Sequence, residues 1–279
     1  MAEITAAAVG KLREMTNAGL MDCKKALTES GGDLNLAVEV LRKKGIASAT
    51  AKGAREAKEG VIVQYVQPGA KLGVLVEVNC ETDFVARNDT FKAFCDEIAR
   101  KIATNPTADY EADRVAAVAK IGENIVISRH QRLEVSGNGM IAAYIHTGGK
   151  VGVLVEVGAG KESTVAHDDF KQLVRDITLQ IAAAHPVSVS REEVDPAVIA
   201  KEKEIAAEQV KNKPPQAVAK IIEGKLEKFF QTYCLVDQGF VKKNSEVSVK
   251  EHIASVAKQL GDEIAVRRFL RFQVGEVSA

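Results

Sequence analysis

The sequence predicts an α+β fold, in which a helical N-terminal domain precedes a duplicated core of antiparallel sheets and helices. Three observations support this prediction. Apolar residues follow a helical period through residues 1–56, one pattern of strands and a helix occurs twice from residue 60 onward, and a helical stretch at about 190–232 interrupts the second copy.

The N-terminal domain, residues 1–56, is predicted to be a three-helix bundle with a linker. The apolar positions of its first helix are Val9, Leu12 and Met15. Asp33 suits the N-cap of the third helix, because its carboxylate can accept hydrogen bonds from free backbone N–H groups. Gly45 is expected to end that helix, which leaves residues 46–56 as a helical linker. A bundle of this size has only a small core, and such modules usually exist to contact something else.

An internal repeat with an offset of 79 residues predicts the duplicated core. Residues 60–104 align with residues 139–183 without a gap, and 17 of the 45 positions are identical, 11 in the strands and the turn between them and 6 in the helix. GVIVQYVQPGAKLGVLVEV in the first copy corresponds to GMIAAYIHTGGKVGVLVEV in the second. Each copy reads as a strand, a glycine-containing hairpin turn, a second strand and a helix.

The repeat defines two core units, residues 57–138 and residues 139–279. After the first copy, Arg114–Asn124 is predicted to be a helix that leads into a strand at Ile125–Ile127, with Leu133–Val135 as a further candidate strand. The second unit contains an antiparallel helical hairpin at about 190–232, in which Lys-Pro-Pro forces the turn. The closing VRRFLRFQVGE is predicted to be a last strand that completes the second sheet.

The charge balance argues against nucleic acid as the main ligand. The chain has 38 basic and 38 acidic residues, whereas binding to a phosphate backbone needs a basic excess on one face. No apolar stretch approaches the roughly 20 residues that span a bilayer, and the N-terminus lacks the features of a targeting peptide. We therefore expect a cytoplasmic protein that makes no membrane contact.

Motifs for enzymatic chemistry are missing from the sequence. There is no glycine-rich phosphate-binding pattern, and the histidines are not grouped with carboxylates as in a metal site. The cysteines lie far apart and are predicted to be reduced thiols: Cys23, Cys80, Cys95 and Cys234. A catalytic Cys80 stays an alternative, although a thiol at the end of a strand is more often structural. We expect no enzyme, no metal and no cofactor.

One acidic segment, Thr82–Val85, differs between the two copies. It follows the strand GVLVEV in the first copy, whereas the same strand in the second copy leads to Lys161-Glu162-Ser163-Thr164. In one interpretation, Asp83 caps a turn and Phe84 folds into the core. In the other, Phe84 is an exposed anchor for a partner, because the second copy completes the same architecture without an aromatic residue. The repeat favours the second interpretation, in which Phe84 is an exposed anchor.

Several segments resemble one bacterial protein family. They are LREMTNAGLMDCKKALTESGGDL, EVNCETDFVARNDTF, VAKIGENI, HTGGKVGVLVEV and RFLRFQVGE. Over nearly its whole length the chain is similar to elongation factor Ts, the nucleotide exchange factor for the GTPase elongation factor Tu. The resemblance implies a three-helix N-terminal domain like a ubiquitin-associated domain, a duplicated core and a coiled-coil hairpin.

The resemblance also implies roles for individual residues. The segment that enters the nucleotide domain of elongation factor Tu and helps to displace Mg²⁺ would be Thr82, Asp83, Phe84 and Val85. Further contacts with the partner would come from Arg13, Leu20, Met21, His146 and Val241. His146 would face the third domain of the partner, and Lys242 stands where the family commonly has an apolar residue. The factor itself would bind no nucleotide.

Two alternatives stay open from the sequence. An RNA-binding or scaffold protein could use the basic N-terminal helices, since residues 1–58 carry ten basic and seven acidic side chains. A small-molecule enzyme on the α+β core would need a pocket with convergent polar groups. Salt-dependent RNA binding would support the first alternative, and turnover of a substrate would support the second.

Overall fold

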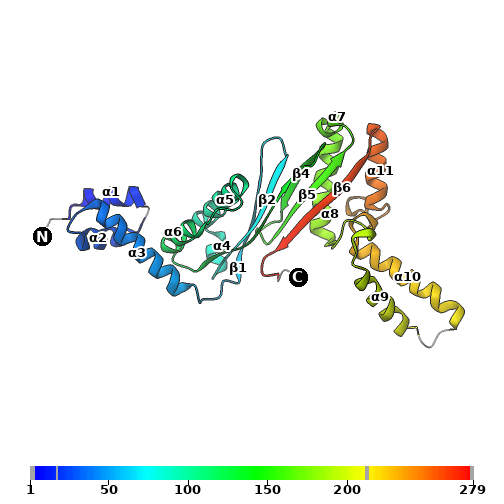
Figure 1. The fold of residues 1–279 in the computed structure, drawn as a ribbon, viewed down its shortest axis with the longest axis horizontal. Helices are drawn as coiled ribbons and strands as arrows, with labels where there is room; N and C mark the ends of the chain where they lie inside the picture. The colour runs from blue at the N-terminus through cyan, green and yellow to red at the C-terminus, as the bar shows by residue number, and fades with distance from the viewer. Residues whose placement is uncertain (1–3, 17, 211–213, 277–279) are drawn as a thin grey trace.

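The computed structural model describes residues 4–16, 18–210 and 214–276, which form an elongated molecule (Figure 1). A helical bundle lies at one end, two sheet-and-helix units follow, and a helical hairpin projects beyond them. The fold is α+β, as predicted, with two three-stranded antiparallel sheets. Among the helices of these residues, none has the length and apolar character needed to cross a lipid bilayer.

Three helices build the N-terminal bundle: α1 (Ala6–Thr16), α2 (Leu20–Glu29) and α3 (Leu34–Lys52). Asp33 caps α3 as predicted, since its carboxylate accepts hydrogen bonds from the backbone N of Asn35 and Leu36 at 2.8 and 3.0 Å. The buried core of the bundle is small and consists of Val9, Leu12, Cys23, Ala26, Leu27 and Ala37.

The prediction that Gly45 ends the third helix is wrong. Helix α3 continues through Gly45 to Lys52, so the expected linker is largely the second half of one helix. Gly45 is buried, and a Cβ at that position would lie 3.5 Å from Ala119 on α6 (Glu111–Ile121). Packing on α6 offsets the roughly 1 kcal/mol that an interior glycine costs relative to alanine. Helix α3 thereby ties the bundle to the first core unit.

The first core unit is a sheet of order β1–β2–β3 with helices on one face. It comprises β1 (Glu59–Val66), β2 (Leu72–Cys80), α4 (Asp83–Arg87), α5 (Asp89–Thr104), α6 and β3 (Ile125–Glu134). The predicted hairpin and helix are confirmed, and the third strand is continuous from Ile125 to Glu134, joining the two predicted segments. All of β2 is buried, because α5 covers one face of the sheet and the second sheet covers the other.

The second core unit repeats this arrangement. It comprises β4 (Gly139–Ile145), β5 (Val151–Ala159), α7 (Glu162–Ala166), α8 (Asp168–Ala184), α11 (Val249–Leu260) and β6 (Ile264–Gln273). The predicted C-terminal strand is confirmed as β6, which pairs with β5. Helix α11 was not predicted. Ser248 and Glu251 form a capping box at its start, and this spacing of serine and glutamate is a known sequence signal for the start of a helix.

The predicted helical hairpin is confirmed. It consists of α9 (Pro196–Glu208) and α10 (Pro215–Tyr233), which pack along each other and project from the second unit (Figure 1). Lys213 of the predicted turn lies outside the described residues. Asp195 caps α9 by accepting a hydrogen bond from the backbone N of Ala197 at 2.8 Å.

Arg191 fastens the base of the hairpin to the core. It lies in a single 3₁₀ turn, η1 (Arg191–Glu193), and similar turns η2 (Leu235–Asp237) and η3 (Val241–Lys243) follow α10. Its guanidinium donates to Asp237 at 2.8 and 3.0 Å and to Glu227 on α10 at 2.6 and 2.9 Å. The same group lies 4.7 Å from the ring centre of Phe230. Charged and aromatic contacts together hold α10 at its base.

The structural repeat is longer than the sequence repeat. Helices α6 and α11 both end at a left-handed glycine, Gly122 and Gly261, and both lead into the third strand of a sheet. In each sheet the register shifts beside a buried glutamate, Glu77 or Glu156. Helices α6 and α11 and the third strands β3 and β6 are related by an offset of 139 residues instead of 79, because the hairpin is inserted before α11.

The two sheets pack face to face with matching contacts in both directions. Ile62 N donates to Gly149 O at 2.6 Å, and the equivalent Ile141 N donates to Ala70 O at 2.8 Å. The core between the sheets consists of Ile62, Leu75, Leu133, Ile141, Leu154 and Phe272. The two units are therefore arranged like the subunits of an isologous dimer. This packing fixes the position of one unit's surface relative to the other's.

Candidate partner-binding surfaces

Phe84 is more exposed than any other large apolar side chain of the described residues, with 82% of its surface accessible. It lies on α4, a single helical turn between β2 and α5. The interpretation in which Phe84 folds into the core is therefore wrong. Leaving a phenylalanine in water forgoes about 2 kcal/mol of burial free energy, and an aromatic side chain held on a short helix suits insertion into a partner.

A carboxylate from another segment fixes the start of α4. Glu123, in the turn between α6 and β3, accepts hydrogen bonds from the backbone N of Glu81 and Thr82 at 3.0 Å each. It also accepts a hydrogen bond from Thr82 Oγ1 at 2.6 Å. Thr82 Oγ1 in turn accepts from Val85 N at 3.3 Å and so caps α4. These bonds tie α4 to the sheet and give Phe84 a fixed direction.

The four residues of the predicted segment divide into two kinds. Asp83 and Phe84 face solvent, and Asp83 pairs with the exposed Arg87 at 2.9 Å, one turn along α4. Thr82 caps the helix, and Val85 packs against the core of the first unit. Thr82 and Val85 therefore support the segment, while Asp83 and Phe84 are available to a partner.

The second unit has the same single-turn helix without the aromatic residue. In α7, Ser163 stands where α4 has Phe84, and the following Thr164 is buried. Asp262 takes the place of Glu123, since its Oδ2 accepts a hydrogen bond from Lys161 N at 2.9 Å. The short helix is thus part of the shared scaffold, and the exposed phenylalanine belongs to one copy alone.

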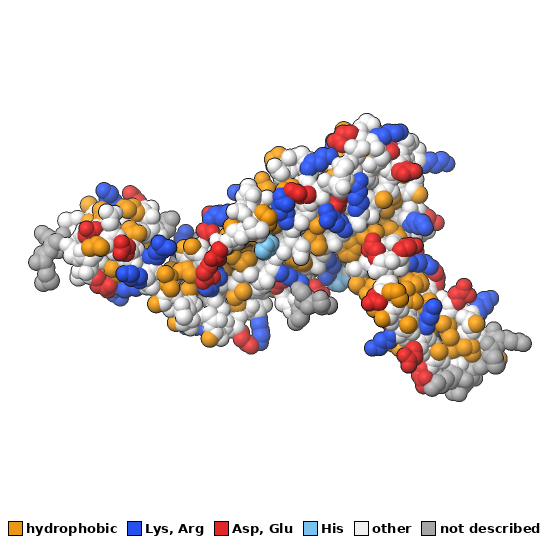
Figure 2. All heavy atoms as spheres, viewed as in Figure 1, with side chains coloured by type: hydrophobic (Ala, Val, Ile, Leu, Met, Phe, Trp, Pro, Cys, Tyr) orange, Lys and Arg blue, Asp and Glu red, His pale blue; other side chains and the backbone are white. Residues whose placement is uncertain are grey.

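A second apolar surface lies on the N-terminal bundle (Figure 2). Leu20 and Met21, at the start of α2, are 53% and 65% exposed, and Met15 near the end of α1 is 53% exposed. The predicted contact residue Arg13 is also exposed, in the last turn of α1. Exposed apolar side chains and an exposed cation on the same small bundle suit a protein surface with mixed character.

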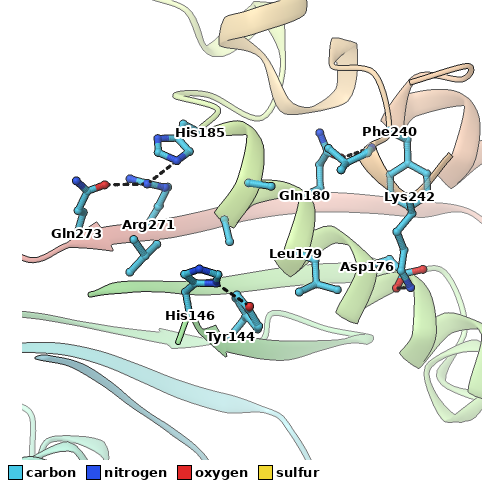
Figure 3. Close-up of a pocket in the computed structure, with 14 residues that line it drawn as sticks. Tyr144, His146, Asp176, Leu179, Gln180, His185, Phe240, Lys242, Arg271 and Gln273 are labelled. Atoms are coloured by element: carbon cyan, nitrogen blue, oxygen red, sulfur yellow. Dashed lines mark hydrogen bonds and ion pairs between the residues drawn. The ribbon is translucent and has the colours of Figure 1, made fainter. Parts of the chain in front are cut away.

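The remaining predicted contact residues meet at a hollow of about 510 Å³ in the second unit (Figure 3). His146 follows β4, and its Nδ1 lies 3.0 Å from Tyr144 Oη. Val241, in η3, is 49% exposed and lines the same hollow. Helix α8 contributes the opposite wall through Leu179. Residues far apart in the sequence therefore form one concave surface.

The residues that follow the hairpin, from Phe240 to Lys242, are divided between the core and the surface. Phe240 is buried and stacks on His252, with 4.3 Å between the ring centres. Lys242 extends over α8 to pair with Asp176 at 2.6 Å. The basic residue that departs from the family pattern thus has a partner within the second unit, and Val241 is the apolar side chain of η3 left at the surface.

Few of the described residues offer groups for covalent or metal chemistry. They contain no group of three or more His, Cys, Asp or Glu side chains placed to hold a metal ion. All four cysteines are buried and free. Burial raises the pKa of Cys80 to about 12, with Glu123 adding to the effect, so this thiol stays protonated and is a poor nucleophile at neutral pH.

Comparison with known proteins identifies the family. Residues 81–276 match the family model described as "Elongation factor TS". The chain belongs to the elongation factor Ts family. It is 46% identical to "Elongation factor Ts" of Symbiobacterium thermophilum over 99% of this chain and 93% of that protein. The protein of the same name from Nitratidesulfovibrio vulgaris is 40% identical over 99% and 97% of the two chains. Membership makes this chain a translation elongation factor.

Sequence reasoning missed the residue that orients the exposed phenylalanine in this family member. Glu123 lies in the VAKIGENI segment that resembles the family, yet no local pattern links it to Thr82. The signal that could have found it is the second repeat offset, which aligns Glu123 with Asp262. Both acidic residues follow a helix-ending glycine, and both accept a backbone hydrogen bond from the start of the short helix.

Proposed function

We propose that this chain binds elongation factor Tu and accelerates the release of GDP from it. The proposal makes the chain a guanine-nucleotide exchange factor, which makes and breaks no covalent bond and needs no cofactor. Its family supports a role beside that GTPase, and a translation factor is expected to act in the cytoplasm. The observation that carries the proposal is the exposed side chain of Phe84 on a short helix fixed by Glu123.

The mechanism is a coupling between two binding events. A factor that binds the nucleotide-free GTPase more tightly than the GDP-bound form weakens GDP binding by the same ratio. Moving the GTPase from mostly loaded to mostly empty takes about 5 kcal/mol of differential binding. In our proposal Phe84 enters the nucleotide domain and displaces the groups that hold Mg²⁺, while Asp83 assists by electrostatic competition or by accepting a hydrogen bond from the displaced backbone.

The remaining surfaces would hold the partner while Phe84 acts. Arg13, Leu20 and Met21 would contact the nucleotide domain, and the hollow beside His146 and Val241 would receive the third domain. Several separated contacts on a rigid scaffold allow a large interface, in which a few anchors supply most of the binding free energy. The face-to-face packing of the two sheets keeps these contacts in register.

The RNA-binding alternative gains no support from a specific contact. Lys44, one of the N-terminal basic residues, pairs with Glu29 at 2.5 Å. Three apolar side chains of the same bundle, Met15, Leu20 and Met21, are 53–65% exposed. Phosphate recognition depends on unpaired cations, so this surface suits a protein better than a nucleic acid.

The test is the release of fluorescent GDP from elongation factor Tu in Mg²⁺ buffer. We expect this chain to accelerate release strongly and to have a smaller effect when Mg²⁺ has already been removed by a chelator. Acceleration that is the same with and without Mg²⁺ would contradict displacement of the ion. If the chain gave no acceleration in either buffer, exchange itself would be excluded.

A further inference from the structure

Arg271 is a buried cation with unused hydrogen-bond donors. It lies on β6, lines the hollow in the second unit, and its side chain is 8% exposed (Figure 3). Arg271 Nη2 donates to His185 Nε2 at 2.9 Å and to Gln273 Oε1 at 3.0 Å. Nε is buried and has no hydrogen-bond partner among the described residues. Nη1 faces Glu276 at 3.8 Å, which is beyond hydrogen-bond distance.

The first core unit has an equivalent arginine whose Nε is hydrogen-bonded within the unit. Arg132 on β3 is opposite Val74, and Arg271 on β6 is opposite Val153, so the two arginines occupy the same position in the repeat. Arg132 Nε donates to Ala103 O at the end of α5, at 3.2 Å. Its Nη2 donates to Glu134 at 2.5 Å. The equivalent Nε of Arg271 lacks such a bond.

An incompletely paired guanidinium is costly in a buried position. Removing a charged group from water without a full set of partners destabilises the protein, and burial lowers the pKa of Arg271 from its usual value. Buried polar groups in natural proteins nearly always have a hydrogen-bond partner, so a donor without one calls for an acceptor from outside the folded chain. The unused donors of Arg271 therefore indicate a missing acceptor at the hollow.

The charges around the hollow favour an anion. Two cations, Arg271 and Lys242, line it together with one carboxylate, Asp176, and the imidazole of His185 accepts from Arg271 and is neutral. That carboxylate is already paired with Lys242 at 2.6 Å. Apolar side chains, including Val151, Leu179 and Val241, form the rest of the wall. An acidic side chain with apolar neighbours in a protein loop matches this combination better than a small free anion, which would leave the apolar wall uncovered.

We propose that the hollow receives an acidic side chain of the protein partner, whose carboxylate pairs with Arg271 while neighbouring apolar residues cover Leu179 and Val241. The proposal rests on the function proposed above and adds the chemistry of the second-unit contact. Arginine suits this role because its planar group can donate two parallel hydrogen bonds to one carboxylate. The incoming carboxylate would supply the acceptor that Glu276 only approaches.

The test compares two matched variants of the full chain, Arg271→Lys and Arg132→Lys. Both keep a positive charge and lose the planar guanidinium at the same position of the repeat. Affinity for nucleotide-free elongation factor Tu would be measured by calorimetry, and each variant's melting temperature would be recorded. We expect Arg271→Lys to weaken the complex at least tenfold and Arg132→Lys to leave affinity within about twofold of the wild type. Equal affinities for the two variants would overturn the proposal.

If Arg271→Lys lowers the melting temperature, weaker binding could reflect instability of the variant. Substitutions on the partner then provide the deciding test. Each Asp and Glu on the surface of the third domain of elongation factor Tu would be replaced by Asn or Gln. One substitution should weaken binding to the wild-type chain and have no further effect on Arg271→Lys. If no acidic residue of the partner showed this coupling to Arg271, the proposed carboxylate contact would be refuted. If the wild type neither bound the GTPase nor released GDP, the proposed function itself would fail.

Discussion

At the scale of single residues, the candidate site depends on an exposed aromatic group whose orientation is set from a distance. Phe84 could be predicted from the sequence because the second copy of the repeat lacks it. Glu123 could not, because its hydrogen bonds to Thr82 join segments on either side of three helices. Composition and spacing do not reveal which carboxylate completes a turn elsewhere in the chain.

Replacing Glu123 should impair exchange by releasing the start of α4. Glu123→Ala removes an acceptor for two backbone N–H groups and one hydroxyl, so we expect a loss of about 2 kcal/mol in the free energy of unfolding. We also expect GDP release to slow severalfold, because Phe84 is no longer held in one direction. Urea unfolding and the fluorescent GDP assay measure the two effects.

Asp262→Ala is the matched control, since Asp262 holds α7 in the second unit. This variant should also lose stability but keep the wild-type rate of GDP release, because α7 carries no aromatic residue. A similar slowing in both variants would mean that the loss of exchange reflects general instability and not the orientation of Phe84.

At the scale of helices and strands, the repeated hairpin and the helix after it were the most predictable elements. The gapless repeat identified β1, β2 and α5 together with their second copies. Helix α11 was missed, and so was the equivalence of β3 and β6, because the inserted hairpin changes the offset of the repeat. Gly45 was misread as a helix end, because packing of α3 on α6 is a tertiary contact that overrides helix propensity.

Gly224 offers a test of the hairpin as an independent element. It lies inside α10, and a Cβ at that position would meet no atom within 4 Å. Gly224→Ala should therefore stabilise the helix by about 1 kcal/mol, because alanine loses less backbone entropy. Hydrogen exchange of the α10 amides should slow by about fivefold, which corresponds to that free energy.

The control is Gly10→Ala in α1, where a Cβ also meets no atom within 4 Å. That variant should leave the exchange of the α10 amides unchanged. If the α10 amides exchanged faster after Gly224→Ala, then α10 would not be helical at residue 224 or would have no room there for a methyl group.

At the scale of the whole molecule, the packing of the two sheets determines where the surfaces stand. The segment around Phe84 is carried by the first unit, and the hollow with Arg271 is carried by the second. A shared core and two matching backbone hydrogen bonds join these units. The distance between the two contacts is therefore a property of this interface, which no local sequence pattern could have predicted.

Glycine at the interface allows the sheets to approach each other. A Cβ on Gly73 would lie 2.6 Å from Ile141 Cγ2 and 2.8 Å from Leu154 Cδ1, both in the opposite unit. Gly73→Ala should lower the free energy of unfolding by about 1–3 kcal/mol, because the added methyl overpacks a buried contact. Urea unfolding measures the loss, and Gly224→Ala serves as the control. A Gly73→Ala variant as stable as the wild type would show that the sheets are not closely packed.

The central claim is that Phe84 drives nucleotide exchange, and the most direct measurement compares Phe84→Ala with Val187→Ala. Both residues are exposed, at 82% and 63%, so neither truncation should change the melting temperature appreciably. Release of fluorescent GDP from elongation factor Tu would be followed with each variant. The account predicts at least a tenfold smaller acceleration with Phe84→Ala and an unchanged rate with Val187→Ala. Full acceleration by Phe84→Ala would contradict it.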